Sequence, residues 1–432
     1  MFQIGLFEKA YADQYIENGY SYAVPQVNDV TFLNGLSEPV HRWFRLTPSY
    51  SPELVRFLVK YLDCSKNTLI CDPFLGKGTT AIELKRLGLP IVGVELNPLL
   101  KMVSDYALTW EVDRGDFAGY CLSVEKEISE LIESHKNDSL EEVLDRQALS
   151  VPVIHNVFRW WRKPILKDLL LAKKVVLRVQ NEEYKKLLWI ALCSSSLDCA
   201  NIHRNHPTIT FDDDHARKIN VSADFKENVD HILKDLERLP SKNWGKAKVL
   251  LGDSTKLASV VHNKIDRVIT SPPYPNRFSY IHQTRPQLFF MEVFENAAQS
   301  ADVDLAAIGG TWGKATSIIY DGIVEPYPHL AEILDSVIEE LRPKSNLMCN
   351  YAVKYFNMLD SHIQQLLKIV NPGFRGAYVV GNSRLSGVEI VTEVVSAKIF
   401  EAHGFNVDNL LVFRKRGGRR SLYETAVCIS LP

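Results

Sequence analysis

Two short segments carry residue types and spacings that suit a bound nucleotide with a reacting group beside it. The first reads DPFLGKGTT, and its glycines Gly76 and Gly78 allow a tight turn and the close approach of a ligand to the backbone. Glu95 ends the next apolar run, where a carboxylate can accept hydrogen bonds from both hydroxyls of a ribose. A purely structural turn between a strand and a helix would also use such glycines. The segment predicts a nucleotide-type cofactor if a second motif supplies the chemistry.

The second segment, TSPPYPNRFSY, follows an apolar run and contains two prolines that cannot continue a central strand. They fix a rigid loop at the end of the strand, where open α/β sheets hold their ligands. The loop suits a planar base with an exocyclic amine, because the oxygen of Ser271 and the carbonyl of Pro272 can accept its two N–H hydrogens. The nitrogen lone pair then turns out of conjugation, and Tyr274 can stack on the base. The catalytic candidates are Ser271, Pro272, Pro273 and Tyr274.

Together, DPFLGKGTT, VGVELNP, GDS and TSPPY resemble the S-adenosylmethionine-dependent DNA amino-methyltransferases, which modify N4 of cytosine or N6 of adenine. The resemblance covers residues 40–109 and 246–432. It implies that the Gly-rich loop binds the methionine part of the cofactor, that Glu95 binds the ribose and that Asp253 contacts the adenine. The cofactor-binding residues implied in this way are Asp72, Phe74, Gly76, Gly78, Thr79, Thr80, Glu95, Asn97 and Asp253.

The first residue of the catalytic loop decides which amine is expected to react. Ser271 is similar to the cytosine-N4 members of the family, whereas the adenine-N6 members usually carry Asp or Asn there. We therefore expect N4-methylcytosine in double-stranded DNA, with the target base flipped out of the helix. Adenine-N6 methylation and an RNA or protein amino-methyltransferase are the alternatives. Methylation of a ring carbon needs a cysteine after a proline, and none of the seven cysteines follows one, so we expect direct transfer with no metal.

The chain departs from the family pattern in two respects. The cofactor motif precedes the catalytic motif, which reverses the order usual for members with the DPFxGxGTT wording. A circular permutation keeps the sheet and the chemistry, but it leaves the target-recognition part without a family-based position. Lys77 also occupies a position that is usually small. We expect its ammonium group to point to water and not to the cofactor carboxylate.

Two other classes of protein would use some of the same residues. Gly76-x-Gly78-x-x-Ala81 also satisfies the loose dinucleotide fingerprint of a nicotinamide dehydrogenase. In that class the Ser-Pro-Pro-Tyr loop has no role, and no Tyr–Lys or His–Asp catalytic pair is apparent. A non-catalytic DNA-binding module is the other rival, although both active-site motifs are intact.

Alternating strands and helices must position these motifs. Apolar runs predict strands over residues 67–71 and 91–95 with a helix over 80–87 between them, and a helix beginning at Ser51 with Pro52 in its first turn. Further strands are expected at 249–251 and 267–270. The βαβ order predicts an α/β fold: a Rossmann-like methyltransferase sheet, mostly parallel, with an antiparallel C-terminal hairpin and a large helical insertion.

The insertion and the C-terminal part complete the predicted organisation. Residues 110–245 have helical periodicity, with two helices between 160 and 197 and another capped by Ser222. We expect helices at 330–341 and 391–403, and strands at 347–353, 378–380, 410–413 and 425–429, the last two antiparallel. The predicted division is residues 1–109 for cofactor binding with an N-terminal arm, 110–245 for a helical, DNA-contacting insertion, and 246–432 for catalysis.

Basic residues supply the candidates for phosphate contact. Residues 158–186 are basic and carry tryptophans, although an amphipathic surface helix would look the same. Residues 414–420 are strongly basic and lie between two predicted strands. The DNA-binding candidates are Arg159, Arg162, Lys163, Arg204, Arg277, Arg416, Arg419 and Arg420.

The composition agrees with a globular enzyme. Of 432 residues, 46% are hydrophobic and 24% charged, which excludes a disordered or collagen-like chain. The net charge of −2 means that any nucleic acid must be met by local patches. We expect no membrane span, no secretory signal and free thiols in a reducing cytoplasm, and a functional pairing with a restriction endonuclease.

Overall fold

The computed structural model describes residues 19–25, 27, 35, 37–46, 49–203, 209–212, 217–240, 242–310, 317, 319–320, 322–416 and 422–432. In this part of the chain an eight-stranded sheet has the order β1-β9-β10-β6-β5-β2-β3-β4. Its strands are β1 (Tyr22–Ala23), β2 (Ile70–Asp72), β3 (Ile91–Glu95), β4 (Ala247–Leu251), β5 (Ile265–Thr270), β6 (Val370–Gly381), β9 (Asn406–Arg416) and β10 (Leu422–Ser430). β10 pairs antiparallel with both of its neighbours, and the other pairings are parallel.

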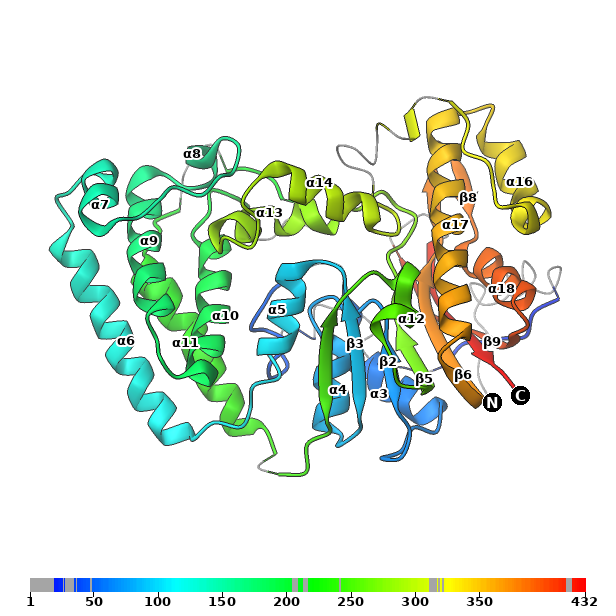
Figure 1. Ribbon diagram of the computed structural model, residues 1–432, viewed down its shortest axis with the longest axis horizontal. Helices are drawn as coiled ribbons and strands as arrows, with labels where there is room; N and C mark the ends of the chain where they lie inside the picture. Colours follow the sequence, from blue (N-terminus) through cyan, green and yellow to red (C-terminus); the bar gives the residue numbers. More distant parts are fainter. Residues whose placement is uncertain are drawn as a thin grey trace.

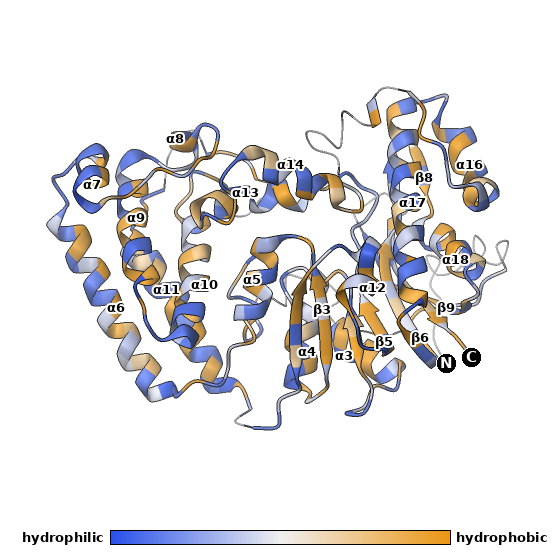
Figure 2. Ribbon diagram, in the orientation of Figure 1, coloured by the Kyte–Doolittle hydropathy of each residue, from blue (hydrophilic) through white to orange (hydrophobic). Residues whose placement is uncertain are grey.

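Helices cover both faces of the sheet, as Figure 1 shows. One face packs on α3 (Pro52–Tyr61), α4 (Thr79–Arg86) and α5 (Pro98–Tyr106). The other packs on α12 (Leu257–Val260), α16 (Ala331–Leu341), α17 (Asn346–Leu367) and α18 (Thr392–Ala402). Successive side chains of β5 alternate between the two cores, with Val268 in one and Ile269 in the other. Burial on both faces explains why β3 is apolar up to Glu95 and is drawn mainly in orange in Figure 2.

The insertion is helical, as predicted. It contains α6 (Arg114–Ser134), α7 (Leu140–Gln147), α8 (Val157–Trp160), α9 (Lys163–Leu177), α10 (Glu182–Asp198) and α11 (Val221–Arg238). These helices form the left-hand part of Figure 1, and α10 contacts α5 and α13 (Tyr280–Phe290). α14 (Ala297–Ala306) packs on α13 above the sheet. Two short 3-10 helices, η1 (Ser254–Lys256) and η2 (Pro328–Leu330), and a small hairpin, β7 (Ser383–Leu385) with β8 (Val388–Ile390), complete the described elements.

The predicted α/β sheet with an antiparallel C-terminal hairpin and a helical insertion is confirmed. The strand predicted at 347–353 is wrong, because these residues lie in α17 behind the N-cap Ser345. Their apolar run suits a buried helix as well as a strand, and only packing distinguishes the two. The cap predicted at Ser222 is also wrong, since Asn220 accepts the hydrogen bond from the Ala223 amide at 3.1 Å. None of the described helices is both long and apolar enough to cross a membrane.

Candidate active site

A cavity of about 280 Å³ opens at the carboxyl ends of the central strands. β2 lies between β3 and β5. The β2–β3 connection packs α4 on one face of the sheet, and the β5–β6 connection packs α16 and α17 on the other, so this is the point where an open α/β sheet leaves a crevice. The loops after β2, β3, β4 and β5 all reach it. The lining residues from these loops include Phe74, Gly76, Thr79, Glu95, Asn97, Asp253, Ser271, Pro273 and Tyr274.

The Gly-rich loop after β2 needs its glycines. Gly76 has φ of 58° and Gly78 has φ of 94°, a left-handed backbone that is unfavourable for other residues. A Cβ atom on Gly78 would also lie 2.9 Å from Cβ of Ser104 in α5. The loop therefore closes tightly against α5, and α4 begins at Thr79 with its free amides near the cavity.

Asp72 lies beneath this loop, outside the lining of the cavity. Its carboxylate accepts hydrogen bonds from the hydroxyls of Thr80 and Thr270, both at 2.5 Å, and from the Phe74 amide at 3.0 Å. Complete burial raises its pKa to about 6. Asp72 and Thr80 thus connect β2, α4 and β5, and the cofactor-binding role predicted for them could only be the indirect one of shaping the loop.

Glu95 lines the cavity at the end of β3 and is nearly buried. Its two carboxylate oxygens accept hydrogen bonds from the Gly76 amide at 2.7 Å and the Asn97 amide at 2.8 Å. Burial raises its pKa to about 7, against the opposing effect of these amides. The carboxylate is therefore held rigidly, with lone pairs left for hydroxyl donors in the cavity.

Three further predicted cofactor residues line the same cavity. The Asn97 side chain caps α5 by accepting from the Leu99 amide at 3.0 Å, and it donates to the Thr284 hydroxyl at 2.9 Å. Asp253 caps η1 by accepting from the Thr255 amide at 2.9 Å. Phe74 packs edge-on against His362, with ring centroids 4.8 Å apart, and presents an apolar surface. The segments DPFLGKGTT, VGVELNP and GDS thus meet around one cavity.

The Ser-Pro-Pro-Tyr loop faces these residues from the end of β5. Ser271 donates to the Val379 carbonyl at 3.0 Å, which leaves its oxygen lone pairs available as acceptors. The Pro273 carbonyl accepts from the Tyr355 hydroxyl at 2.8 Å, and the Tyr274 hydroxyl donates to Glu424 at 2.8 Å. Pro272 is buried next to the lining residues. The loop is therefore fixed by contacts to β6, α17 and β10.

Lys77 does not point to water, contrary to the expectation from the sequence. It is buried, and its ammonium group donates to the carbonyls of His41 at 3.0 Å and Phe44 at 3.4 Å. Burial lowers its pKa to about 8. The residues that cover it belong to the arm segment, which we define as residues 37–46, and no local pattern around Lys77 announces this contact.

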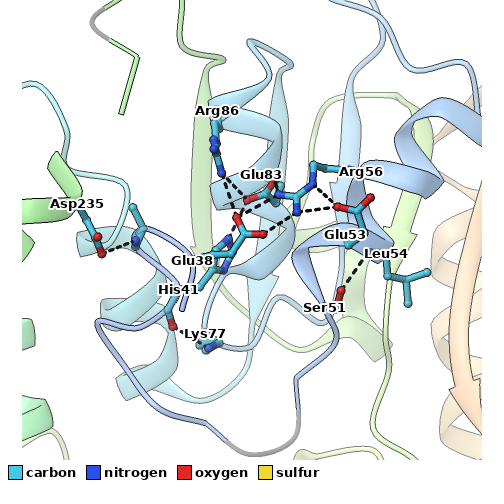
Figure 3. Close-up of polar contacts among 11 residues, drawn as sticks. Glu38, His41, Ser51, Glu53, Leu54, Arg56, Lys77, Glu83, Arg86 and Asp235 are labelled. Atoms are coloured by element: carbon cyan, nitrogen blue, oxygen red, sulfur yellow. Dashed lines mark hydrogen bonds and ion pairs between the residues drawn. The ribbon is translucent and has the colours of Figure 1, made fainter. Parts of the chain in front are cut away.

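The arm segment connects the insertion to the cofactor loop, as Figure 3 shows. On one side, Asp235 of α11 accepts from the Val40 amide at 3.0 Å and from the side chains of Arg42 and Trp43, both at 2.9 Å. On the other, His41 bonds to Glu83 of α4 at 2.9 Å and its carbonyl accepts from Lys77. The arm segment therefore connects α11 of the insertion with α4 and with the Gly-rich loop.

Replacing Asp235 by Ala is expected to lower the free energy of unfolding by about 3 kcal/mol, because it leaves buried donors of the arm segment without their acceptor. Urea unfolding at constant pH measures the change. Asp230→Ala, at a more exposed position on the same helix, is the control and should cost little. Equal stabilities of the two variants would contradict the bridging role.

The predicted DNA-binding residues differ in their exposure and in their contacts. Arg159 and Arg277 are exposed, and Arg159 stacks on Phe211 at 4.1 Å. Lys163 is exposed and paired with Glu141 at 2.6 Å, and Arg162 is half-buried. The remaining candidates are Arg416, which lines the cavity, and Arg204, Arg419 and Arg420, which lie outside the described residues.

Sequence reasoning missed some of the lining residues. Arg414 and Glu424 come from the C-terminal strands and form an ion pair of 2.5 Å at the cavity. Ser254, which belongs to the GDS segment noted in the sequence, also lines it, as does Tyr50. The basic run around Arg414 is visible in the sequence, but its direction depends on strand register, which a single sequence does not reveal.

Known proteins align with almost the whole chain. The Type II methyltransferase M.BsoBI of Geobacillus stearothermophilus is 23% identical over 94% of this chain and 87% of its own length. The Type II methyltransferase M.MvaI of Kocuria varians is 20% identical over 94% and 90%. The Type II methyltransferase M.AvaI of a Nostoc strain is 22% identical over 97% and 90%.

Two solved structures align with most of this chain at low sequence identity. TrmN from Thermus thermophilus aligns with 88% of this chain and 49% of its own at 11% identity, with a TM-score of 0.30. The rRNA methyltransferase aviRa from Streptomyces viridochromogenes aligns with 91% and 92% at 9% identity, with a TM-score of 0.31. No family model matches the chain.

The residues of the cavity fit S-adenosylmethionine, which is the cofactor of this class. Glu95 offers lone pairs to a ribose, Gly76 permits close approach, and the Phe74 ring offers an apolar surface. A dehydrogenase would give the Ser271 loop no task. The motifs, the strand order and the similarity over 94% of the chain agree, and together they confirm that this chain is a methyltransferase related to the DNA amino-methyltransferases of restriction-modification type.

Proposed function

We propose that the protein is a site-specific DNA methyltransferase that transfers a methyl group from S-adenosylmethionine to the N4 amine of a flipped cytosine. The observation that carries the proposal is the meeting of two motifs in one cavity. Glu95 and Gly76 line one side, and Ser271 and Tyr274 line the other. A bound cofactor and a planar base would therefore share this space.

The residues of the loop would prepare the amine for attack. Ser271 already donates to a carbonyl, so its oxygen can accept one amine hydrogen while the Pro272 carbonyl accepts the other. Glu95 and Gly76 would hold S-adenosylmethionine, which would supply an activated methyl group to the amine nitrogen with cleavage of its carbon–sulfur bond and depart as S-adenosylhomocysteine. The surplus proton on nitrogen passes to water. The cofactor supplies an activated methyl group, and the protein supplies position.

Cytosine-N4 is favoured over adenine-N6 by the serine at the head of the loop. A hydroxyl accepts one hydrogen without carrying charge, whereas the adenine-N6 family members usually present Asp or Asn. Adenine-N6 methylation is the second candidate, because the cavity residues also suit a purine amine. An RNA substrate is less favoured, because the relatives over the whole chain are Type II methyltransferases.

The proposal also assigns a role to each of three parts of the chain. We assign residues 1–109 to cofactor binding, 246–432 to catalysis and the insertion, 110–245, to contact with double-stranded DNA. We also propose a cytoplasmic location and a functional pairing with a restriction endonuclease, because the relatives over the whole chain are Type II methyltransferases.

The identity of the modified base tests the proposal directly. Purified protein is incubated with genomic DNA and S-adenosylmethionine, and the DNA is digested to nucleosides for mass spectrometry. N4-methylcytosine is the expected product. N6-methyladenine would replace the cytosine assignment and leave the transfer mechanism intact, whereas the absence of any modified nucleoside on all DNAs would refute both.

Cofactor binding is expected to weaken in acid. Glu95 has a pKa of about 7 in the free protein, and hydroxyl donors favour its ionised form, so the pKa falls on binding. Affinity should therefore be constant above pH 7 and fall by up to ~10-fold per pH unit below it. Calorimetric titrations of S-adenosylmethionine from pH 8 to pH 6 measure this. Glu95→Gln should lose this slope, and an unchanged slope would assign it to another group.

Exposed arginines are expected to bind phosphate. Neutralising Arg159 and Arg277 together should weaken binding at every DNA sequence and lower the slope of log K against log salt concentration by ~0.9 for each phosphate that is no longer neutralised. Fluorescence anisotropy over a series of salt concentrations measures the slope. Lys398→Gln is the comparison, because this exposed lysine of α18 lies outside the insertion and is not among the candidates for phosphate contact. A slope equal to that of the wild type would show that both arginines are ordinary surface residues.

A further inference from the structure

The two C-terminal strands bring charged side chains against the ring of Tyr274. Glu424 of β10 is almost fully buried, and its carboxylate accepts from the Tyr274 hydroxyl at 2.8 Å through one oxygen. Its other oxygen accepts from Arg414 of β9 at 2.5 Å. Both residues line the cavity. The hydroxyl end of the tyrosine is thus tied to a carboxylate that is itself held by an ion pair.

Arg416 fixes the same ring from its face. The guanidinium carbon lies 5.0 Å from the ring centroid, in a cation–π contact. Its nitrogens bond to the carbonyls of Asn382 and Tyr423, so the group is anchored on the backbone of the neighbouring strands. The ring of Tyr274 is therefore restrained at its edge and on one face.

A glycine in β6 makes room for this packing. Gly381 pairs with Glu424 across the strands, and a Cβ atom on it would lie 2.5 Å from the Arg416 guanidinium and 2.8 Å from the Tyr274 ring. Any larger residue would push the two groups apart. Three adjacent strands thus combine to hold one side chain of the catalytic loop.

We propose that Glu424 is a positioning residue, which sets the plane of the Tyr274 ring so that its open face stacks on the target base, with Arg416 supporting the opposite face. The inference rests on the proposed function. Removing the restraint lets the ring rotate, so the amine is presented less often in line with the methyl group. The effect belongs to the rate of the chemical step, because Glu424 touches neither reacting atom.

A double-mutant cycle tests the contact without any need for turnover. Glu424→Ala, Tyr274→Phe and the double variant are unfolded in urea. Glu424→Ala should cost less stability in the Tyr274→Phe background than in the wild type, because the hydroxyl partner has already gone. The matched control is the surface pair Tyr20 and Glu401, joined by a hydrogen bond of 2.6 Å away from the cavity. Additive losses at Tyr274 and Glu424 would overturn the inference.

Single-turnover methylation then tests the positioning role. Tyr274→Phe and Glu424→Ala should each lower the rate ~10-fold or more, the double variant should be no slower than the slower single, and affinity for S-adenosylmethionine should stay within about twofold. Full rates in both single variants would overturn the inference. A wild type that methylates no DNA would instead refute the proposed function, and the stability cycle would still decide whether the Tyr274 restraint exists. If Glu424→Ala does not fold, Tyr274→Phe alone carries the rate test.

A separate cluster of two histidines and an aspartate lies on the face of the sheet that packs on α16, α17 and α18. His329 of η2 and His403 at the end of α18 both place Nε2 against Oδ1 of Asp360 in α17, at 2.8 and 2.6 Å. Asp360 is fully buried, and its other oxygen accepts from Gln364 at 2.8 Å. Among the described residues, these two imidazoles are its only charged or titratable partners.

We infer that this cluster binds a divalent transition metal ion. Two imidazoles and a carboxylate are a common ligand set for Zn²⁺, and a buried carboxylate without a Lys or Arg partner needs a compensating charge. The three ligand atoms lie within 4.8 Å of one another, so side-chain rotations would let them all reach one ion at ~2.0–2.2 Å. The His329 side chain is 43% exposed, which leaves a fourth position open to water. The ion would join η2, α17 and α18.

Metal titration of the chelator-treated protein tests this site. One equivalent of Co²⁺ should produce visible d–d absorption, and Zn²⁺ should raise the melting temperature. His329→Ala and His403→Ala should each lose both effects, whereas His262→Ala, an exposed histidine elsewhere, should keep them. No stoichiometric binding by the wild type, or unchanged binding by both variants, would show that the cluster is held by hydrogen bonds alone.

Discussion

Replacing Ser271 by Ala is expected to slow methyl transfer ~10²–10³-fold, the size of effect seen when a single group that acts mainly in the transition state is removed. The Ser271 oxygen would accept one amine hydrogen, and this contact strengthens as the nitrogen lone pair turns toward the methyl carbon. Affinity for S-adenosylmethionine should change less than about twofold, because Ser271 would touch the base and not the cofactor. Single-turnover assays with saturating DNA and cofactor separate the two quantities.

The control for Ser271→Ala is Ser259→Ala. Ser259 also donates to a backbone carbonyl, at 2.7 Å, but it is exposed and outside the cavity, so its variant should methylate at the wild-type rate. A Ser271→Ala enzyme with full turnover would remove the hydroxyl from the mechanism. A loss of cofactor affinity as large as the loss of rate would show instead that the loop had collapsed.

The parts of the fold that can be predicted are those with a local cause. β3 lies at its predicted bounds because the run Ile-Val-Gly-Val, closed by Glu95, stands between a turn and a helix cap. The helix after Ser51 is predictable from Pro52 at its first position and from the cap itself. Glu95 ends β3 and Ser271 directly follows β5, so their meeting follows from parallel strand ends sharing one edge.

The parts that cannot be predicted depend on contacts between distant segments. The start of α17 is buried on most sides, so its sequence is an apolar run with few polar positions. Such a run has the pattern of a buried strand. Lys77 has the pattern of a solvated residue, but the arm segment covers it. Glu424 carries no motif, and its place at the cavity depends on pairing with Gly381 and Arg414 across two strands.

Arg416 illustrates how one residue type can support two hypotheses. In the sequence it belongs to a basic run, which favours phosphate contact. In the structure it lines the cavity and covers Tyr274. Phe413 of β9 is bulged opposite the step from Glu424 to Thr425, which shifts the register of the pair, and strand register is not encoded in any short pattern. Its neighbours Arg419 and Arg420 keep the phosphate hypothesis as a prediction.

Glu95→Ala is expected to weaken cofactor binding at least ~100-fold. Two hydrogen bonds from ribose hydroxyls to a carboxylate would disappear, each worth ~1.5–3 kcal/mol. The variant also removes the acceptor for the Gly76 and Asn97 amides, so the loop loses part of its support. Glu95→Gln keeps the shape, but its NH₂ group would face one of those amide donors, so it should also bind weakly. Calorimetry at pH 8, where Glu95 is ionised, measures both affinities.

The decisive comparison sets Glu95→Ala against Ser271→Ala. Both residues line one cavity, but only Ser271 would contact the reacting amine. Glu95→Ala should therefore bind poorly yet recover most of its rate at saturating cofactor, whereas Ser271→Ala should bind normally and stay slow at any concentration. Equal cofactor affinity in Glu95→Ala and the wild type would refute the ribose assignment. If both variants lost rate and affinity together, the cavity would behave as one structural unit, and its two sides could not be assigned to cofactor and base.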